Sequence, residues 1–167
     1  LEHSLSAVGM CAGKNVKLAE SQARMLRPEF FAMADKGAAR ELKTVLADTD
    51  ITVLAGLEGI KEMIARSQAD IAVNSIMGRA GLEPTLAAIE KGMNIALANK
   101  ETLVAAGKIV MAAARREGVK ILPVDSEHCA IAQCLTAGRH EEVSRLIITA
   151  SGGPFFGRTR DELRDIT

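Results

Sequence analysis

The chain has 167 residues, enough for one domain with a hydrophobic core and too few for two domains of ordinary size. Its 21 Lys and Arg residues balance its 21 Asp and Glu residues, and it has four Phe but no Trp or Tyr, which argues against binding to nucleic acid or an anionic membrane. No apolar run is long enough to span a membrane, and the spacing of Cys11, Cys129 and Cys134 suits neither a disulfide framework nor a zinc site, so we expect a cytoplasmic protein with reduced thiols.

The first predicted strand covers residues 4–13, and a predicted helix follows it. Asn15 is a suitable N-cap for this helix, and Pro28 ends it. The apolar residues of the helix recur at spacings of three and four, and they are Val16, Ala19, Ala23 and Leu26.

The same alternation of short apolar runs with amphipathic stretches continues to residue 150. In chain order, the further predicted strands cover residues 30–34, 51–56, 70–78, 93–99, 119–124 and 144–150. The predicted helices between them cover residues 36–48, 57–64, 82–92, 100–118 and 128–138. Pro84 in the first turn and Gly92 at the end delimit one of these helices.

Apolar strands that are separated by helices are typical of a parallel sheet covered on both faces. Because such crossovers are right-handed, the sequence predicts an α/β protein with a doubly wound, Rossmann-like parallel sheet. Ligands bind outside the carboxyl ends of the strands in these sheets. The loops of interest therefore follow Gly9, Gly56, Gly78, Ala98, Val124 and Ala150.

Gly13, Lys14 and Asn15 form a candidate anion-binding turn after the first predicted strand. Gly13 permits a tight turn, and Lys14 with the amides near Asn15 can hold an anion. In a dinucleotide-binding fold, a basic residue at this place suits the 2′-phosphate of NADP. Gly-Lys-Asn is also ordinary turn chemistry, so both interpretations stay open.

The glycine fingerprint of dinucleotide-binding folds, G-x-G-x-x-G, is absent from the sequence. The segment GRAGLEP at residues 78–84 spaces its glycines differently and lacks the third one. Either the protein binds no dinucleotide, or the chain begins after the first strand and helix of that fold.

Asn99, Lys100 and Glu101 stand at the end of the strand predicted over residues 93–99. Three polar side chains at this place could contact a cofactor and a substrate together. A plain helix start explains the same residues, with Asn99 as the cap and Glu101 near the positive end of the helix dipole.

The segment DSEH, residues 125–128, follows the strand predicted over residues 119–124. If strand geometry continues past Pro123, Asp125 and Glu127 point to one side and offer hard oxygen ligands for Mg²⁺ or Mn²⁺. Ser126 is then available to a phosphate or hydroxyl of the ligand. Asp-Ser capping of the next helix is the alternative, and a hydrogen bond to the backbone is expected for His128.

Ser151, with Gly152 and Gly153, follows the last predicted strand and could cradle a phosphate, although a Gly-Pro turn explains the same residues. Nucleophilic catalysis is not expected, because the chain has no G-x-S-x-G elbow. Neither Cys129 nor Cys134 has a persuasive base partner.

Three segments, LANKETLV (97–104), PVDSEH (123–128) and TASGGPF (149–155), resemble the 1-deoxy-D-xylulose-5-phosphate reductoisomerase family in their order and spacing. The segments CAGKN (11–15) and GRAGLEPTLAAIEKG (78–92) fit the same family. The resemblance runs along essentially the whole chain.

The resemblance implies an enzyme of non-mevalonate isoprenoid biosynthesis that uses NADPH and a divalent ion, Mg²⁺ or Mn²⁺. Its substrate would be a small sugar phosphate, 1-deoxy-D-xylulose 5-phosphate, whose carbon skeleton is rearranged before reduction to 2-C-methyl-D-erythritol 4-phosphate. A Lewis acid stabilises charge on the substrate oxygens during such a rearrangement.

The resemblance also implies which residues bind NADPH. Gly13, Lys14 and Asn15 would contact the adenosine 2′-phosphate end of the cofactor, and Asn99 and Glu101 would lie along it.

The same resemblance also implies which residues bind the metal ion and the substrate. Asp125 and Glu127 would coordinate the ion, whereas Lys100, Ser126, Glu127 and Ser151 would contact the substrate. Lys100 and Glu127 are thereby the expected catalytic residues.

Members of the family are longer than this chain and open with a GSTGSIG-type cofactor loop. The resemblance implies that residues 1–124 are an NADPH-binding domain without its first strand and Gly-rich loop. Residues 125–167 would begin the catalytic, metal-binding domain. The full enzyme is expected to be an active homodimer, cytoplasmic or plastidic according to its source, and this chain alone to be inactive.

Two other functions fit parts of the pattern. One is a non-catalytic α/β nucleotide-binding module, and the other is a different sugar-phosphate dehydrogenase, such as a relative of homoserine dehydrogenase. The combination of DSE with SGGPF favours the reductoisomerase over the dehydrogenase. Binding of Mn²⁺ or NADPH would distinguish the reductoisomerase from the non-catalytic module.

Overall fold

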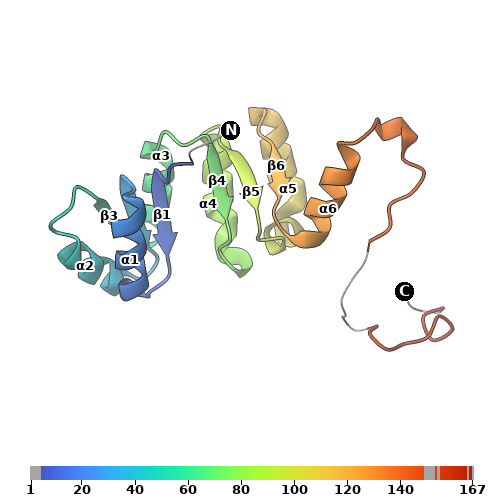
Figure 1. Ribbon diagram of the computed structural model, residues 1–167, viewed down its shortest axis with the longest axis horizontal. Coiled ribbons are helices and arrows are strands. Elements are labelled where there is room, and N and C mark those ends of the chain that lie inside the picture. The colour runs from blue at the N-terminus through green and yellow to red at the C-terminus, as the bar shows by residue number, and fades with distance from the viewer. Residues whose placement is uncertain (1–4, 149–152, 154, 165, 167) are drawn as a thin grey trace. The chain divides into compact units, whose positions relative to one another are not determined.

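The computed structural model describes residues 5–148, 153, 155–164 and 166. The chain divides into two compact units, residues 1–122 and residues 123–167. Strands and helices alternate along the first unit (Figure 1). Within the described ranges, no helix is both long enough and apolar enough to cross a membrane.

The first sheet has three parallel strands, with β2 between β1 and β3. Phe30 of β2 lies opposite Gly9 of β1 on one side and opposite Thr52 of β3 on the other. The elements of this part are β1 Gly9–Ala12, α1 Val16–Leu26, β2 Phe30–Met33, α2 Lys36–Val45, β3 Thr52–Ala55 and α3 Gly56–Arg66.

The second sheet also has three strands, in the order β4-β5-β6. β4 and β5 are parallel, with Asn74 opposite Leu97 at their carboxyl ends. The elements of this part are β4 Ile71–Asn74, the 3₁₀ turn η1 Gly78–Gly81, α4 Leu82–Glu90, β5 Asn94–Leu97, α5 Glu101–Glu117 and β6 Ile121–Pro123.

Helices cover both faces of the first sheet, which confirms the predicted doubly wound arrangement. All four residues of β2 are buried, and successive side chains of a strand point to opposite faces. Phe31 and Met33 belong to a hydrophobic cluster with residues of α1 and α2. Phe30 and Ala32 belong to a second cluster with residues of α3.

This second cluster joins the two sheets of the first unit. Residues of α3, such as Ile60 and Ile64, belong to it together with Phe30 of β2. Ile95 and Leu97 of β5 belong to the same cluster. The helix that connects β3 to β4 therefore shares one apolar core with both sheets.

The strands form two separate three-stranded sheets, whose open edges include β1 and β4 (Figure 1). Among the described residues, β1 pairs only with β2, and β4 pairs only with β5. Apolar side chains remain exposed at β4, where Val73 is 71% and Ile71 is 48% exposed.

The helix boundaries follow local signals in the sequence. The Asn15 side chain accepts a hydrogen bond from the Leu18 amide at 3.1 Å and so caps α1, as predicted. Gly118 has a φ of 67° and ends α5 in the left-handed conformation. Within α5, Ala106 departs from helical geometry with a φ of −141°, so the helix is kinked there.

The second unit contains α6 Ser126–Leu135 and a 3₁₀ turn, η2 His140–Glu142. The strand predicted over residues 144–150 is wrong in its described part, because residues 144–148 have no assigned secondary structure. A strand requires a neighbour to pair with. Within the described part of this unit, no strand lies beside the segment, and Ile147 and Ile148 are 71% and 66% exposed.

Candidate functional site

The residues predicted to bind the cofactor all belong to the first unit, and those predicted to bind metal all belong to the second. In the first unit they follow β1 and β5, at the carboxyl ends of parallel strands. In the second unit they lie at the start of α6.

The turn after β1 is built by Gly13, Lys14 and Asn15, all of which are exposed. The Gly13 carbonyl accepts a hydrogen bond from the Asp35 amide at 3.2 Å, which ties the turn to the loop after β2. A Cβ placed on Gly13 would meet no atom within 4 Å. The chain itself therefore leaves room beside Gly13 and Lys14 for a ligand.

Cys11 lies on β1, two residues before this turn. Desolvation raises the pKa of its thiol, although the residue as a whole is exposed. A raised pKa keeps the thiol protonated at neutral pH, and a protonated thiol is a poor nucleophile.

Asn99 is buried at the end of β5 and uses its side chain within the protein. Its Nδ2 donates to the carbonyls of Ile76 and Gly78, and the Gly78 bond measures 2.8 Å. Its Oδ1 accepts from the Thr102 amide at 3.2 Å, which is the capping contact expected of a helix start. Both hydrogens of the amide are thus donated, and only the oxygen keeps a further lone pair.

Lys100 and Glu101 follow Asn99 and are both exposed at the beginning of α5. Glu101 lies in the first turn, where the helix dipole favours a negative charge. The two side chains can therefore reach a ligand outside the carboxyl end of β5 without disturbing the core.

A buried polar cluster, which no sequence motif marks, lies beside Asn99. Asn74, at the end of β4, donates through Nδ2 to the Gly81 carbonyl at 2.9 Å and to Thr85 Oγ1 at 2.6 Å. Thr85 Oγ1 donates in turn to the Gly81 carbonyl at 2.7 Å. The available signal is an asparagine that ends an apolar strand directly before a glycine-containing loop.

Asp125 is the N-cap of α6 and is not part of a strand. β6 ends at Pro123 and α6 begins at Ser126, so the condition for Asp125 and Glu127 to alternate along a strand is not met. The Asp125 carboxylate accepts a hydrogen bond from the His128 amide at 3.2 Å. This capping bond fixes the carboxylate at the start of the helix.

The His128 ring also contacts the Asp125 carboxylate, through its Nδ1 atom. The backbone hydrogen bond expected for this ring is therefore replaced by a side-chain contact. A carboxylate that orients an imidazole is a common arrangement around metal and acid–base sites.

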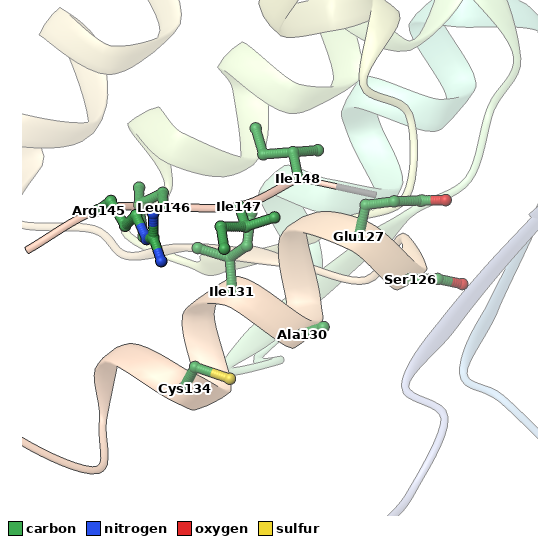
Figure 2. A pocket seen from close by; sticks show the side chains of 9 residues that line it. All are labelled: Ser126, Glu127, Ala130, Ile131, Cys134, Arg145, Leu146, Ile147 and Ile148. Carbon is green, nitrogen blue, oxygen red and sulfur yellow. The ribbon is translucent and has the colours of Figure 1, made fainter. Parts of the chain in front are cut away.

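Ser126 and Glu127 line an open groove of about 430 Å³ between α6 and residues 145–148. Figure 2 shows these two polar side chains at the beginning of α6, with the Arg145 side chain on the segment opposite. The remaining lining is mostly apolar and comprises Ala130, Ile131, Cys134, Leu146, Ile147 and Ile148. The lining thus contains one hydroxyl-bearing, one carboxylate-bearing and one guanidinium-bearing side chain among mostly apolar ones.

Asp125 and Glu127 are hard oxygen ligands of the kind that Mg²⁺ and Mn²⁺ prefer. Within the described ranges, no three His, Cys, Asp or Glu residues gather in a way that could hold a metal ion. Two carboxylates do not complete the octahedral coordination of such an ion, so other groups would have to supply the remaining ligands. Ser151, predicted to contact the substrate, lies outside the described residues.

Comparison with protein families gives two matches along this chain. The sequence model of 1-deoxy-D-xylulose 5-phosphate reductoisomerase matches residues 1–107. The model of the C-terminal domain of the same family matches residues 121–167. Together these matches include every residue assigned above to cofactor, metal or substrate.

Curated relatives give the same result. The chain is 48% identical over 163 residues to a 1-deoxy-D-xylulose 5-phosphate reductoisomerase of Desulfitobacterium hafniense, covering 98% of this chain and 42% of the relative. It is 49% identical over 160 residues to that of Exiguobacterium sibiricum, covering 96% of this chain and 41% of the relative. The chain therefore spans less than half the length of these relatives.

Solved structures agree with the sequence comparison. The reductoisomerase of Zymomonas mobilis in complex with NADPH superposes with a TM-score of 0.82 at 41% identity, over 93% of this chain and 41% of that one. A reductoisomerase structure with fosmidomycin and magnesium gives a TM-score of 0.83 at 33% identity, over 99% of this chain and 44% of that one. The fold, the order of the motifs and the identity all agree: the chain belongs to the 1-deoxy-D-xylulose 5-phosphate reductoisomerase family.

Proposed function

We propose that this chain supplies cofactor-binding and metal-binding residues of an NADPH-dependent reductoisomerase. The enzyme would convert 1-deoxy-D-xylulose 5-phosphate to 2-C-methyl-D-erythritol 4-phosphate in non-mevalonate isoprenoid biosynthesis. The observation that carries the proposal is identity of 48% over 98% of the chain to a reductoisomerase. The polar segments after β5 and β6 lie within that alignment at the ends of strands, where ligands bind in parallel sheets.

The first unit would hold NADPH. Lys14 is exposed beside the open space at Gly13, which suits the negatively charged 2′-phosphate of the adenosine end. Asn15 already caps α1, so its contribution would come from its backbone and from orienting the turn. Asn99 would contact the cofactor through its oxygen, since both of its amide hydrogens are donated to the loop after β4. Glu101 would lie further along the cofactor.

The second unit would hold the divalent ion through Asp125 and Glu127. A carboxylate has about four lone-pair sites, so Asp125 can cap α6, contact His128 and still bind an ion. The helix cap and the histidine contact would hold this carboxylate in one orientation before the ion arrives. That prior ordering is what gives a metal site its selectivity and affinity.

The substrate would be held by Lys100, Ser126, Glu127 and Ser151, with Lys100 and Glu127 as the catalytic residues. When bound, the ion supplies Lewis-acid stabilisation of the substrate oxygens and NADPH supplies the hydride. Lys100 would neutralise negative charge on the substrate, and Glu127 would orient its hydroxyl groups as hydrogen-bond acceptor. Ser126, which lines the groove, offers a hydroxyl that can donate to a substrate oxygen.

A cytoplasmic homodimer without nucleic-acid or membrane partners completes the proposal. The balance of 21 basic and 21 acidic residues supports the absence of polyanionic partners.

The test measures turnover by the full-length gene product. Wild type should oxidise NADPH only when 1-deoxy-D-xylulose 5-phosphate and Mn²⁺ are both present. Glu127→Gln removes a metal oxygen at constant size and should lower kcat by about a hundredfold or more. Glu141→Gln makes the same change at an exposed position of η2 and should leave kcat unchanged.

Two results would contradict the proposal. NADPH binding without substrate-dependent oxidation would instead identify a non-catalytic nucleotide-binding module. Equal turnover of Glu127→Gln and Glu141→Gln would remove Glu127 from the site while leaving the overall activity in place.

A further inference from the structure

Two buried asparagines hold the loop between β4 and α4. Asn74 is 7% exposed and ends β4, and Asn99 is 3% exposed and follows β5. Asn74 Oδ1 accepts from the Ile76 amide at 3.0 Å, while its Nδ2 donates to the Gly81 carbonyl. Asn99 binds the carbonyls of Ile76 and Gly78 in the same loop. The loop is therefore fixed at both its beginning and its end.

Thr85 and Gly81 complete this arrangement. Thr85 is 1% exposed, and its hydroxyl lies between Asn74 Nδ2 and the Gly81 carbonyl. Gly81 leaves the space that both asparagines use, because a Cβ there would lie 2.9 Å from Asn74 Nδ2 and would clash with Asn99 Nδ2. The absence of a side chain at Gly81 allows the close approach.

The direction of these hydrogen bonds orients the backbone of the loop. The carbonyls of Ile76 and Gly78 face Asn99, on the inner side. In a planar trans peptide the N–H group points opposite to the C=O group. The amides of Met77 and Arg79 therefore point away from the asparagines. Backbone N–H groups presented on one side of a loop bind anionic and carbonyl oxygens of ligands.

We propose that Asn74 and Thr85 are positioning residues for NADPH, acting through the loop at residues 75–81. They hold this loop so that the Met77 and Arg79 amides face the bound cofactor, and they do not touch the cofactor themselves. The loop follows β4 and lies beside Asn99, at the carboxyl end of the second sheet. This inference rests on the proposed function, since it requires NADPH at that end of the sheet.

The test compares Asn74→Asp with Asn94→Asp in the enzyme as its own gene encodes it. Asp at position 74 keeps the size and the acceptor for the Ile76 amide, but a carboxylate cannot donate to Gly81 or Thr85. Asn94 provides the matched control: it begins β5, and its Oδ1 accepts from the Lys120 amide at 2.9 Å, a bond that Asp preserves.

Two readouts separate a positioning role from a purely structural one. Exchange of the hydrogen-bonded Ile76 and Leu82 amides should quicken by about tenfold or more in Asn74→Asp and stay unchanged in Asn94→Asp. The KM for NADPH should rise by about tenfold in Asn74→Asp, with a smaller change in kcat and no change in the KM for the sugar phosphate. If Asn74→Asp does not fold, Thr85→Val keeps the buried volume, removes the bridging hydroxyl and is measured in the same way.

Each outcome decides the question. Unchanged loop exchange, or a KM for NADPH equal to that of Asn94→Asp, overturns the positioning role while the proposed function stands. Wild type that does not oxidise NADPH with the sugar phosphate overturns the proposed function, and the cofactor part of this inference with it. Faster exchange together with a selectively raised KM for NADPH supports both.

Discussion

The Asn99 side chain donates a hydrogen bond to the Gly78 carbonyl at 2.8 Å, so a residue that follows β5 holds the loop that follows β4. The two residues are 21 positions apart in the sequence. Their contact makes the segment predicted to meet the cofactor part of a buried network. Changes within this network should therefore affect stability and ligand binding together.

Gly81→Ala should destabilise the protein. The added methyl would clash with Asn99 Nδ2 and lie 3.0 Å from the Ile76 carbonyl oxygen, both of which are held in place. Overpacking of this kind lowers the free energy of unfolding by about 1–3 kcal/mol. Urea unfolding followed by circular dichroism measures the loss. Gly13→Ala is the matched control, because its methyl meets nothing within 4 Å, and a loss equal to that of Gly81→Ala would contradict the argument.

Thr102→Val should leave the stability unchanged or raise it by up to about 1 kcal/mol. The Thr102 hydroxyl is fully buried and has no hydrogen-bond partner among the described residues. Replacing an unsatisfied hydroxyl with a methyl of similar size removes a desolvation penalty. Thr85→Val removes a hydroxyl that is bonded on two sides, and thermal unfolding should show a lower stability for this variant alone. A clear loss in Thr102→Val would show that the hydroxyl has a partner in solution.

Asp125→Asn should separate helix capping from metal binding in the enzyme as its own gene encodes it. Asparagine caps helices about as well as aspartate, so α6 and the overall stability should be preserved. The loss of charge should weaken Mn²⁺ binding by more than about tenfold and lower turnover at limiting Mn²⁺. Asp125→Ala should lose both functions, with about 1 kcal/mol of stability removed with the cap. Full turnover of Asp125→Asn at low Mn²⁺ would exclude the metal role.

Val73→Lys should reduce self-association of the chain. Val73 is 71% exposed on β4, whose outer edge has no partner strand among the described residues, and open apolar edges pair with other chains. A lysine on an edge strand opposes such pairing. Light scattering at increasing concentration measures the effect. Val104→Lys places the same charge at an 86% exposed valine of α5 and should associate like wild type. A wild-type chain that stays monomeric at every concentration would contradict the prediction.

Alkylation of Cys11 should require a higher pH in the folded chain than in the unfolded chain. Desolvation raises the pKa of this thiol, and only the thiolate reacts with iodoacetamide. At a given pH, the folded protein therefore holds less of the reactive form than the same cysteine in urea. Mass spectrometry of the Cys11 peptide after brief labelling across a pH series gives both profiles. Equal midpoints for the folded and unfolded chains would show that the thiol is fully solvated.

Much of the secondary structure could be predicted from the sequence because its signals are local. Apolar spacing and the Asn15 cap place α1, and Pro28 follows its end, as the structure confirms. The predicted strands are longer than those observed; the run over residues 70–78, for example, forms β4 only at Ile71–Asn74. Strand length depends on a pairing partner elsewhere in the chain, which a local pattern does not contain.

The candidate site also has features that the sequence predicts and features that only the structure shows. The sequence places Lys100, Glu101 and Glu127 next to strand or helix ends, and the structure adds that all three are exposed. It does not reveal that the Asn99 amide is used by the loop after β4, nor that Asp125 caps α6 and contacts His128. Those facts depend on where the neighbouring strand and the first helical turn come to lie.

By itself, the sequence determines the alternation of strands and helices, the parallel α/β class and the motifs by which the family is identified. The tertiary structure alone decides that Asn74, Gly81, Thr85 and Asn99 meet in one buried network, and that residues 144–148 form no strand. The physical reason is that the spacing of apolar residues, which predicts strands and helices, can be read within a single segment of the chain. Hydrogen bonds between segments form only where parallel pairing brings distant residues within about 3 Å of each other.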